Sequence, residues 1–150
     1  MKKLLAIMLL CWSQFAHGLV SDELIMIRSS LAFPETMTAL QHAITAQGYT
    51  ISRVQRIDIG LTSSGYKTDK YRVVFFGKID EIYILRDKHP ELIPYLPLKI
   101  AIFAEGEETI LVISNPIAFS QLYPDTELRN VFKQWEQDIV AIFNSVQFAE

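Results

Sequence analysis

The sequence predicts a single small α+β domain, in which helices pack on a mainly antiparallel sheet and a long amphipathic helix lies near the C-terminus. Three observations support this fold class. Two apolar runs, Leu98 to Ala104 and Thr109 to Ser114, are separated by an acidic turn, which is typical of a β-hairpin. Apolar residues recur every three or four positions from Glu127 to about Val146, as in an amphipathic helix. A length of 150 residues with 50% hydrophobic residues fits one domain with one core.

The other elements follow from β-branched runs, helical spacing and the positions of proline and glycine. Further strands are predicted at Leu24 to Arg28, Tyr49 to Ile59 and Lys70 to Phe76. Helices are predicted at Pro34 to Gln47, Ile79 to Lys88 and, as a short helix, Pro116 to Tyr123, with a loop at Gly60 to Asp69. The segment EIYIL, inside the second of these helices, is equally compatible with a strand. Because the hairpin runs are almost continuously apolar, we expect them at the buried centre of the sheet.

Residues 1–18 are predicted to be a secretory signal peptide that is cleaved after about Gly18, which leaves 19–150 as the single domain. Two lysines precede the apolar run Leu4 to Trp12, and Ala16 and Gly18 supply the small residues that a signal peptidase requires. The apolar run is too short to span a bilayer as a helix. We therefore expect an exported protein, periplasmic or secreted, with no transmembrane anchor after cleavage.

Cleavage at this position would remove Cys11, the sole cysteine, and would leave 132 of the 150 residues. Leu10 stands where a lipid-attachment sequence has a small residue, so we do not expect a lipoprotein. A cysteine-free chain has no disulfide, thiol nucleophile, thiolate-bound metal or covalently attached haem. His42 and His89 lack the spacing of a helical metal pair, so no metal site is expected, although a carboxylate-only calcium site stays open.

Charge and motifs exclude further classes of function. Fourteen Lys and Arg face 17 Asp and Glu, and loss of two lysines with the signal peptide changes the net charge from −3 to −5. Nucleic acid is therefore not an expected partner. The chain contains no G-x-S-x-G, G-x-G-x-x-G or G-x-x-x-x-G-K motif, so no catalytic residue and no cofactor is assigned. The acidic pairs at Asp80-Glu81 and in the turn Glu105 to Glu108 are interpreted as solvated surface.

Basic residues form the most promising candidate site. The candidate ligand-binding residues are Lys99, Arg53, Arg56, Tyr66, Lys70 and Arg72. Lys70 and Arg72 occupy alternate positions of one strand and should share a face, which permits a small anion-binding patch. Lys99 is the strongest candidate, because a lone charge in an apolar strand usually has a partner. The alternative is that these charges protect the edges of the sheet against aggregation.

Several short segments carry a resemblance to a known family. They are the helix PETMTALQHAITAQGYTI at Pro34 to Ile51, the strand VVFFG at Val73 to Gly77, YLPLKIAIF at Tyr95 to Phe103, and ISNP at Ile113 to Pro116. Over about residues 24–120 the chain resembles the family called domain of unknown function 302, small α+β domains found alone and in exported bacterial proteins. Gly77 is followed by Lys78 where the family commonly has Asn-Pro, and the helix at about 127–146 extends past the usual end of the domain. The resemblance implies the fold and, for some members, a homodimer; it implies no catalytic residue.

The function predicted from these observations is non-catalytic binding of a small molecule or of another protein of the cell envelope. One alternative is an enzyme with a pocket of carboxylate, tyrosine and lysine side chains between sheet and helices, in which Lys99 or Tyr66 lies beside an acid. The other alternative is an interaction protein that forms a homodimer through a sheet edge or the terminal helix. Light scattering of the cleaved protein tests this last alternative, because a monomer at high concentration would remove it.

Overall fold

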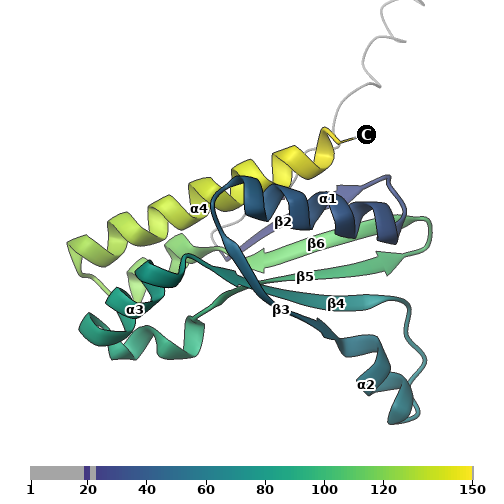
Figure 1. Ribbon diagram of the computed structural model, residues 1–150, viewed down its shortest axis with the longest axis horizontal. Coiled ribbons are helices and arrows are strands. Elements are labelled where there is room, and N and C mark those ends of the chain that lie inside the picture. Colours follow the sequence, from purple (N-terminus) through teal and green to yellow (C-terminus); the bar gives the residue numbers. More distant parts are fainter. Residues whose placement is uncertain (1–18, 21–22, 150) are drawn as a thin grey trace, which may run out of the picture.

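The fold is a six-stranded antiparallel sheet with two long helices on one face, as Figure 1 shows. The computed structural model describes residues 19–20 and 23–149, so the predicted signal peptide lies outside the described residues. The strand order is β1-β2-β6-β5-β4-β3, and every pair of neighbours is antiparallel. This architecture confirms the predicted α+β class, with a mainly antiparallel sheet, packed helices and a long C-terminal helix.

The described segments give the following boundaries. The strands are β1 (Leu19–Val20), β2 (Leu24–Ser29), β3 (Thr50–Arg56), β4 (Tyr71–Gly77), β5 (Leu98–Glu105) and β6 (Glu108–Ser114). The α-helices are α1 (Phe33–Ala46), α2 (Ile57–Ser63), α3 (Ile79–Lys88) and α4 (Thr126–Gln147), and the 3₁₀ helices are η1 (Pro90–Tyr95) and η2 (Pro116–Gln121). The ambiguous segment EIYIL is therefore helical, as the helix prediction had it.

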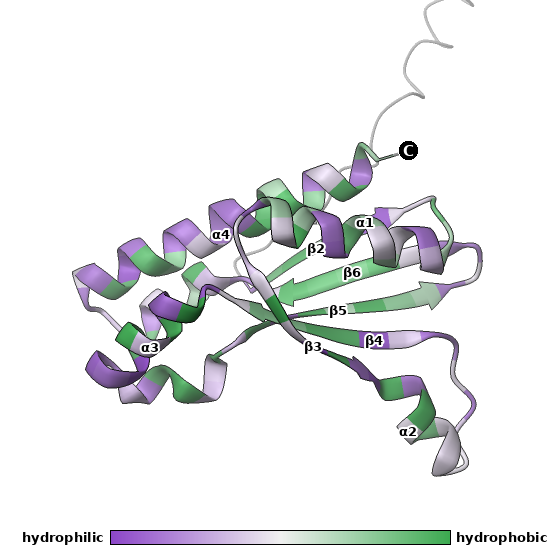
Figure 2. Ribbon diagram, viewed as in Figure 1, coloured by the Kyte–Doolittle hydropathy of each residue, from purple (hydrophilic) through white to green (hydrophobic). Residues whose placement is uncertain are grey.

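The predicted hairpin lies at the centre of the sheet. Strands β5 and β6 pair with each other, and β4 and β2 flank them on either side. Gly106 in the connecting turn has a φ of 62°, a left-handed conformation that glycine adopts without a Cβ clash. Figure 2 shows both strands as predominantly hydrophobic. The expectation of a buried central hairpin is confirmed for the face that the helices cover.

The prediction for residues 57–69 was partly wrong. We expected the third strand to continue to Ile59 and a loop to follow, but the strand ends at Arg56 and α2 begins at Ile57. The sequence of α2 contains Gly60 and several β-branched residues, which favour helix only weakly. The helix is tied to the sheet instead, because Arg72 of β4 forms an ion pair with Asp58 in its first turn. Tertiary contact has overridden local propensity here.

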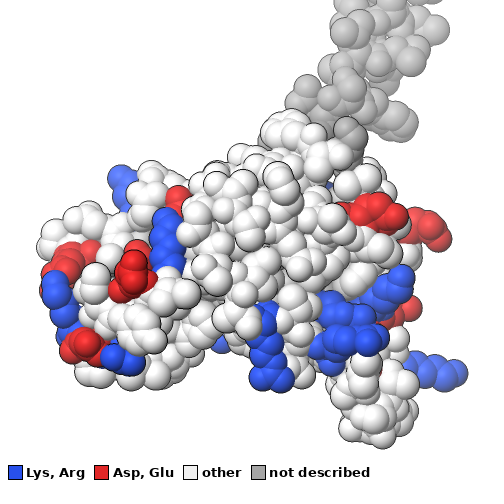
Figure 3. All heavy atoms as spheres, viewed as in Figure 1, with Lys and Arg blue, Asp and Glu red and all other residues white. Residues whose placement is uncertain are grey.

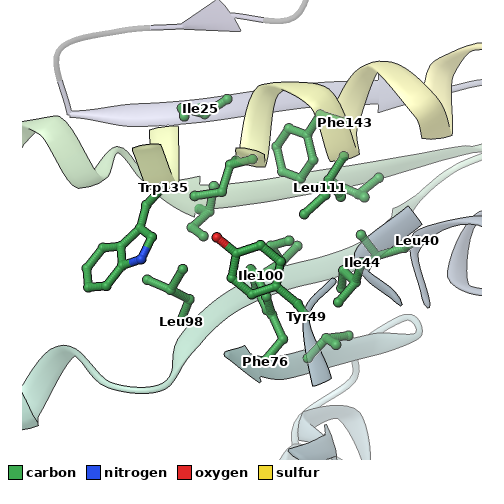
Figure 4. Close-up of a cluster of buried hydrophobic side chains, with 14 of the residues drawn as sticks. Ile25, Leu40, Ile44, Tyr49, Phe76, Leu98, Ile100, Leu111, Trp135 and Phe143 are labelled. Carbon is green, nitrogen blue, oxygen red and sulfur yellow. The ribbon is translucent and has the colours of Figure 1, made fainter. Parts of the chain in front are cut away.

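The hydrophobic core lies between the sheet and the helices α1 and α4. Helix α4 begins at an N-cap, where the side chain of Asp125 accepts a hydrogen bond of 3.0 Å from the amide of Leu128. Its buried stripe is Leu128, Phe132, Trp135, Ile139, Ile142, Phe143 and Val146. Figure 4 shows Phe143 beside Leu111 and Trp135 beside Leu98, both of them residues of the sheet. Within the described residues, no helix is both long and apolar enough to cross a bilayer.

Truncation of a core residue on the central strand should destabilise the domain strongly. Ile100 of β5 is 0% exposed and lies in the main core, so Ile100→Ala should lower the free energy of unfolding by about 2–5 kcal/mol. Lys99→Gln, one residue earlier on the opposite face of the same strand, should change it by no more than about 0.5 kcal/mol. Urea denaturation of both variants measures the contrast, and equal losses would mean that the two faces are not buried as described.

Candidate functional site

One face of the sheet is not covered by α1 or α4, and it is the largest candidate surface of the molecule. Side chains alternate along a strand, so every second residue points away from the core. We call this surface the open face. Its residues are Met26, Arg28, Arg53, Gln55, Tyr71, Val73, Phe75, Lys99, Ala101, Phe103, Glu105, Glu108, Ile110 and Val112. In the described part of the chain, the two long helices lie together on the other side of the sheet (Figure 1).

The cross-strand register arranges the open face in rows of different chemistry. At one end Phe75 pairs with Arg53 of β3 and Lys99 of β5. The next row is aliphatic and small, with Val73, Ala101, Val112 and Met26 in register. The third row is bulkier, with Tyr71, Phe103 and Ile110. Glu105 and Glu108 pair with each other at the far end. The face therefore runs from positive through apolar to negative along the strand direction.

The charged residues at the two ends of the open face differ in whether they form ion pairs. Arg28 forms ion pairs with both Glu105 and Glu108, the second at 2.9 Å. These contacts leave Glu107 at the tip of the turn without an ion pair in the described part of the chain. At the other end, Arg53 and Lys99 are exposed, and neither forms an ion pair within residues 23–149. The partner expected for Lys99 is therefore not found within this described range.

A hollow open to solvent lies at the aromatic end of the open face. Its volume is about 380 Å³, and its lining residues are Thr68, Asp69, Lys70, Tyr71, Ala101, Phe103, Ala104 and Val112. Lys70 is one of the candidate ligand-binding residues, and Tyr71, Phe103 and Val112 supply apolar surface beside it. Among the described side chains, no three or more His, Cys, Asp and Glu are grouped to hold a metal ion.

The remaining basic candidates lie on the helix side of the sheet, near the first residue of α1. Arg56 and Arg72 are directly opposite each other in the β3–β4 register. Lys70 and Arg72 both lie over the ring of Phe33, with 5.9 Å from the Lys70 amine and 5.6 Å from the Arg72 guanidinium to the ring centroid. The prediction that Lys70 and Arg72 share a face is confirmed. We call Arg56, Lys70 and Arg72 the basic edge.

Tyr66 does not join either group. It lies in the loop after α2, and it is 66% exposed. The six predicted residues are thus divided by the fold into Arg53 and Lys99 on the open face, the basic edge on the helix side, and Tyr66 in the loop. The catalytic alternative required Lys99 or Tyr66 beside an acid, and neither has a carboxylate partner among the described residues.

A different carboxylate, tyrosine and lysine do meet, inside the interface of α4 with the sheet. Asp138 accepts hydrogen bonds from the Tyr49 hydroxyl at 2.7 Å, the Lys78 amine at 3.0 Å and the Gln134 amide at 2.9 Å. The Lys78 amine also lies 4.5 Å from the centroid of the Tyr49 ring. Nearby, the indole of Trp135 donates a hydrogen bond of 2.9 Å to Glu81 of α3. We call Tyr49, Lys78, Gln134 and Asp138 the Asp138 cluster.

The electrostatics of the Asp138 cluster suit anchoring and not catalysis. Burial alone would raise the pKa of Asp138, but the hydrogen bonds from Tyr49, Lys78 and Gln134, together with the charge of Lys78, outweigh burial and hold this pKa below its ordinary value. Burial and the hydrogen bond to Asp138 raise the pKa of the Tyr49 hydroxyl far above its ordinary value. Tyr49 therefore stays protonated as a donor and cannot act as a base at neutral pH. The cluster joins α4 to the ends of β3 and β4.

Sequence reasoning missed this cluster, although one feature pointed to it. Asp138 falls inside the apolar stripe of α4, three residues after Trp135 and four before Ile142, and a carboxylate in such a position needs a buried partner. The identity of that partner was not available from the sequence, because Tyr49 is 89 residues away along the chain.

The comparisons with known proteins agree with this fold. The sequence profile described as Domain of unknown function DUF302 matches residues 25–146, so the chain belongs to this family. The match runs past residue 120, where the resemblance in the sequence had placed its end, and includes α4. The crystal structure of an uncharacterized conserved DUF302 protein from Bacillus stearothermophilus is similar, with a TM-score of 0.75 and 14% identity over 82% of this chain and 97% of that chain. No curated protein matches.

Loss of the Asp138 charge should weaken the domain at neutral pH. Asp138→Asn should lower the free energy of unfolding by about 1–3 kcal/mol, because charge-assisted hydrogen bonds in a buried site become neutral ones. The pKa of Asp138 is lower in the folded than in the unfolded chain, where it is about 3.9. The stabilisation is therefore fully present above the unfolded value and is lost as the pH falls through the folded value.

The difference in the free energy of unfolding between wild type and Asp138→Asn should therefore become smaller below about pH 4. Urea denaturation across this range measures it. Glu127→Gln is the matched control, because Glu127 pairs with Lys88 at 3.3 Å on the exposed surface, where the expected change is below about 1 kcal/mol. A pH-independent difference would contradict the assignment of an ionised Asp138.

Proposed function

We propose that this chain is an exported, non-catalytic binding domain that acts through the open face of its sheet. The observation that carries the proposal is that the middle rows of the open face are apolar while the long helices cover the other face. Contiguous apolar surface on a small domain marks an interaction site. A broad sheet face suits a protein partner better than a small ligand, which binds in a concave site that encloses most of its surface.

The occupant that fits the open face best is a second copy of the chain. Its two ends have opposite charge, with Arg53 and Lys99 at one end and the acidic turn Glu105 to Glu108 at the other. The turn carries three glutamates against Arg28, a net charge of −2, which matches the two cations. A surface whose halves complement each other can pair with itself across a two-fold axis.

The charges also select the direction of that axis. If two open faces pack together around an axis in the interface and perpendicular to the strands, the positive end of each lies on the negative end of the other. An axis parallel to the strands would place like charges together and cost energy. Lys99 and Glu105 are six residues apart on β5, about 20 Å along the strand. The selected axis therefore passes near Ile102, midway between them.

Side-chain size supports the same arrangement. With the axis near Ile102, the smaller Ala101 and Val73 lie against the bulkier Phe103 and Tyr71 of the second copy. Ile110 of the same row is 2% exposed and is already covered within its own chain. Large residues packed against small ones can interdigitate across two sheets at the usual separation of about 10 Å. Five strands and four rows span about 20 Å in each direction, a small footprint for a specific interface. We therefore expect concentration-dependent association.

A charge placed in the middle of the open face should prevent this association. Ala101→Lys should shift the protein to a monomer, because two buried lysines would face apolar surface without a partner. Thr45→Lys adds the same charge at an exposed position of α1 and should leave the assembly unchanged. Light scattering over roughly micromolar to millimolar concentration, the range of Kd expected for a small interface, measures the mass. A wild-type monomer throughout that range would remove the homodimer.

Exchange of charge between the two ends tests the direction of the axis. Lys99→Glu alone and Glu107→Lys alone should each weaken the dimer, since each places like charges together. The combination should restore much of the affinity, with a coupling of about 1 kcal/mol or more between the two positions. Glu127→Lys, on α4, serves in place of Glu107→Lys as the control and should not rescue Lys99→Glu. Additive losses in the double variant would argue against this axis.

A further inference from the structure

The basic edge holds three cations together on the helix side of the sheet, away from the open face. Arg56 lies directly opposite Arg72. Lys70 comes two positions before Arg72, and the hydrogen bonding of β4 with β5 extends to it, because its carbonyl accepts a hydrogen bond of 2.9 Å from the Ala104 amide. Like charges directly opposite on neighbouring strands destabilise a sheet. Figure 3 shows Lys and Arg atoms gathered in this region, above α2 and over the start of β4.

One of these cations is already compensated. The Arg72 and Asp58 side chains form an ion pair and are only 14% and 16% exposed. The hydrogen bond from Arg72 is the main reason that the pKa of Asp58 lies below its ordinary value, although partial burial opposes it. Asp58 is therefore ionised and neutralises Arg72. Arg56 and Lys70 are exposed and form no ion pair within the described chain. Asp58 also interacts with the charge of Arg56, and Asp69 lies beside Lys70, so the three cations exceed the neighbouring carboxylates by one.

We propose that Arg56 and Lys70 bind a phosphate group, free or as part of a small phosphomonoester, at the basic edge. The two residues are diagonal neighbours across the β3–β4 pair, about 7–8 Å apart at the backbone, so their long side chains can converge on one anion. The net positive charge of this group attracts a phosphate anion, and the exposed Arg56 guanidinium offers a fork for two of its oxygens. The ring of Phe33 contacts the cationic groups of Lys70 and Arg72 through one of its faces.

The Thr62 hydroxyl near Lys70 adds a donor for the same ligand, whereas the Ser63 and Thr68 hydroxyls donate to the carbonyls of Gly60 and Asp69. A hollow of about 610 Å³ separates α2 from the segment before β4, and Thr62, Ser63, Thr68 and Lys70 contribute to its lining. Asp58 and Asp69 also line it, so the phosphate belongs at the end nearest Arg56 and Lys70 and not in the middle. Arg56 and Arg72 lie on the other side of the sheet from the open face, whereas Lys70 also borders the hollow at its aromatic end. Loss of the homodimer would leave the Arg56 and Arg72 part of this site unchanged.

A titration with inorganic phosphate tests the proposal, with chloride at equal ionic strength as the reference. Backbone amide shifts of the purified protein should saturate and centre on Arg56, Lys70 and Arg72. Arg56→Gln or Lys70→Gln should weaken binding by about tenfold or more. Lys133→Gln, an exposed residue of α4, is the matched control and should leave the affinity unchanged. Because the substituted side chains are exposed, all three variants should keep the melting temperature of wild type.

A second titration with phenyl phosphate separates the two sources of the phosphate group. Tighter binding of phenyl phosphate than of inorganic phosphate would support a phosphomonoester as the ligand, and equal affinities would support free phosphate. Absence of a saturable shift with both compounds in the millimolar range would overturn the proposal. An equal loss of affinity in Lys133→Gln would also overturn it, because the binding would then reflect overall charge and not this site.

Discussion

The fold depends on the alternation of side chains along the central hairpin of β5 and β6. Ile100, Ile102 and Leu111 enter the core under α1 and α4, while Ala101 and Phe103 point to the opposite face. Strands that are apolar on both faces usually have both faces covered. Packing within one described chain accounts for only one of them. The apolar character of the open face is the reason that we propose a contact between molecules there.

The polar side chains of the Asp138 cluster hold α4 in position against the sheet. Asp138 binds Tyr49, Lys78 and Gln134 at once, so α4 is connected to the ends of β3 and β4 as well as packed on the core. This arrangement uses one tyrosine, one lysine and one carboxylate to anchor the helix. The binding that we propose at the sheet face and at the basic edge requires no reactive group.

Periodicity made most of the fold predictable. The hairpin, α1, α3 and α4 lie where apolar spacing, proline and glycine placed them. Helix α2 was missed because its own residues favour helix only weakly, while the ion pair that joins it to β4, between Asp58 and Arg72, connects residues 14 positions apart. For the candidate site, alternation placed Lys70 beside Arg72, but the row of Arg53, Phe75 and Lys99 depends on the register of three strands. Local sequence patterns do not contain that register.

Cysteine cross-linking tests the central claim most directly, because Cys11 is the sole native cysteine and can be replaced by serine. In that background, a bismaleimide with a spacer of about 13 Å should link Lys99→Cys chains to Glu107→Cys chains as heterodimers, because the facing sheets lie about 10 Å apart. Lys99→Cys alone should cross-link poorly, since the two copies of position 99 would be about 20 Å further apart along the strand, beyond the reach of the spacer. Preferential linkage of Lys99→Cys to itself, or linkage no greater than for exposed Thr45→Cys on α1, would contradict the account.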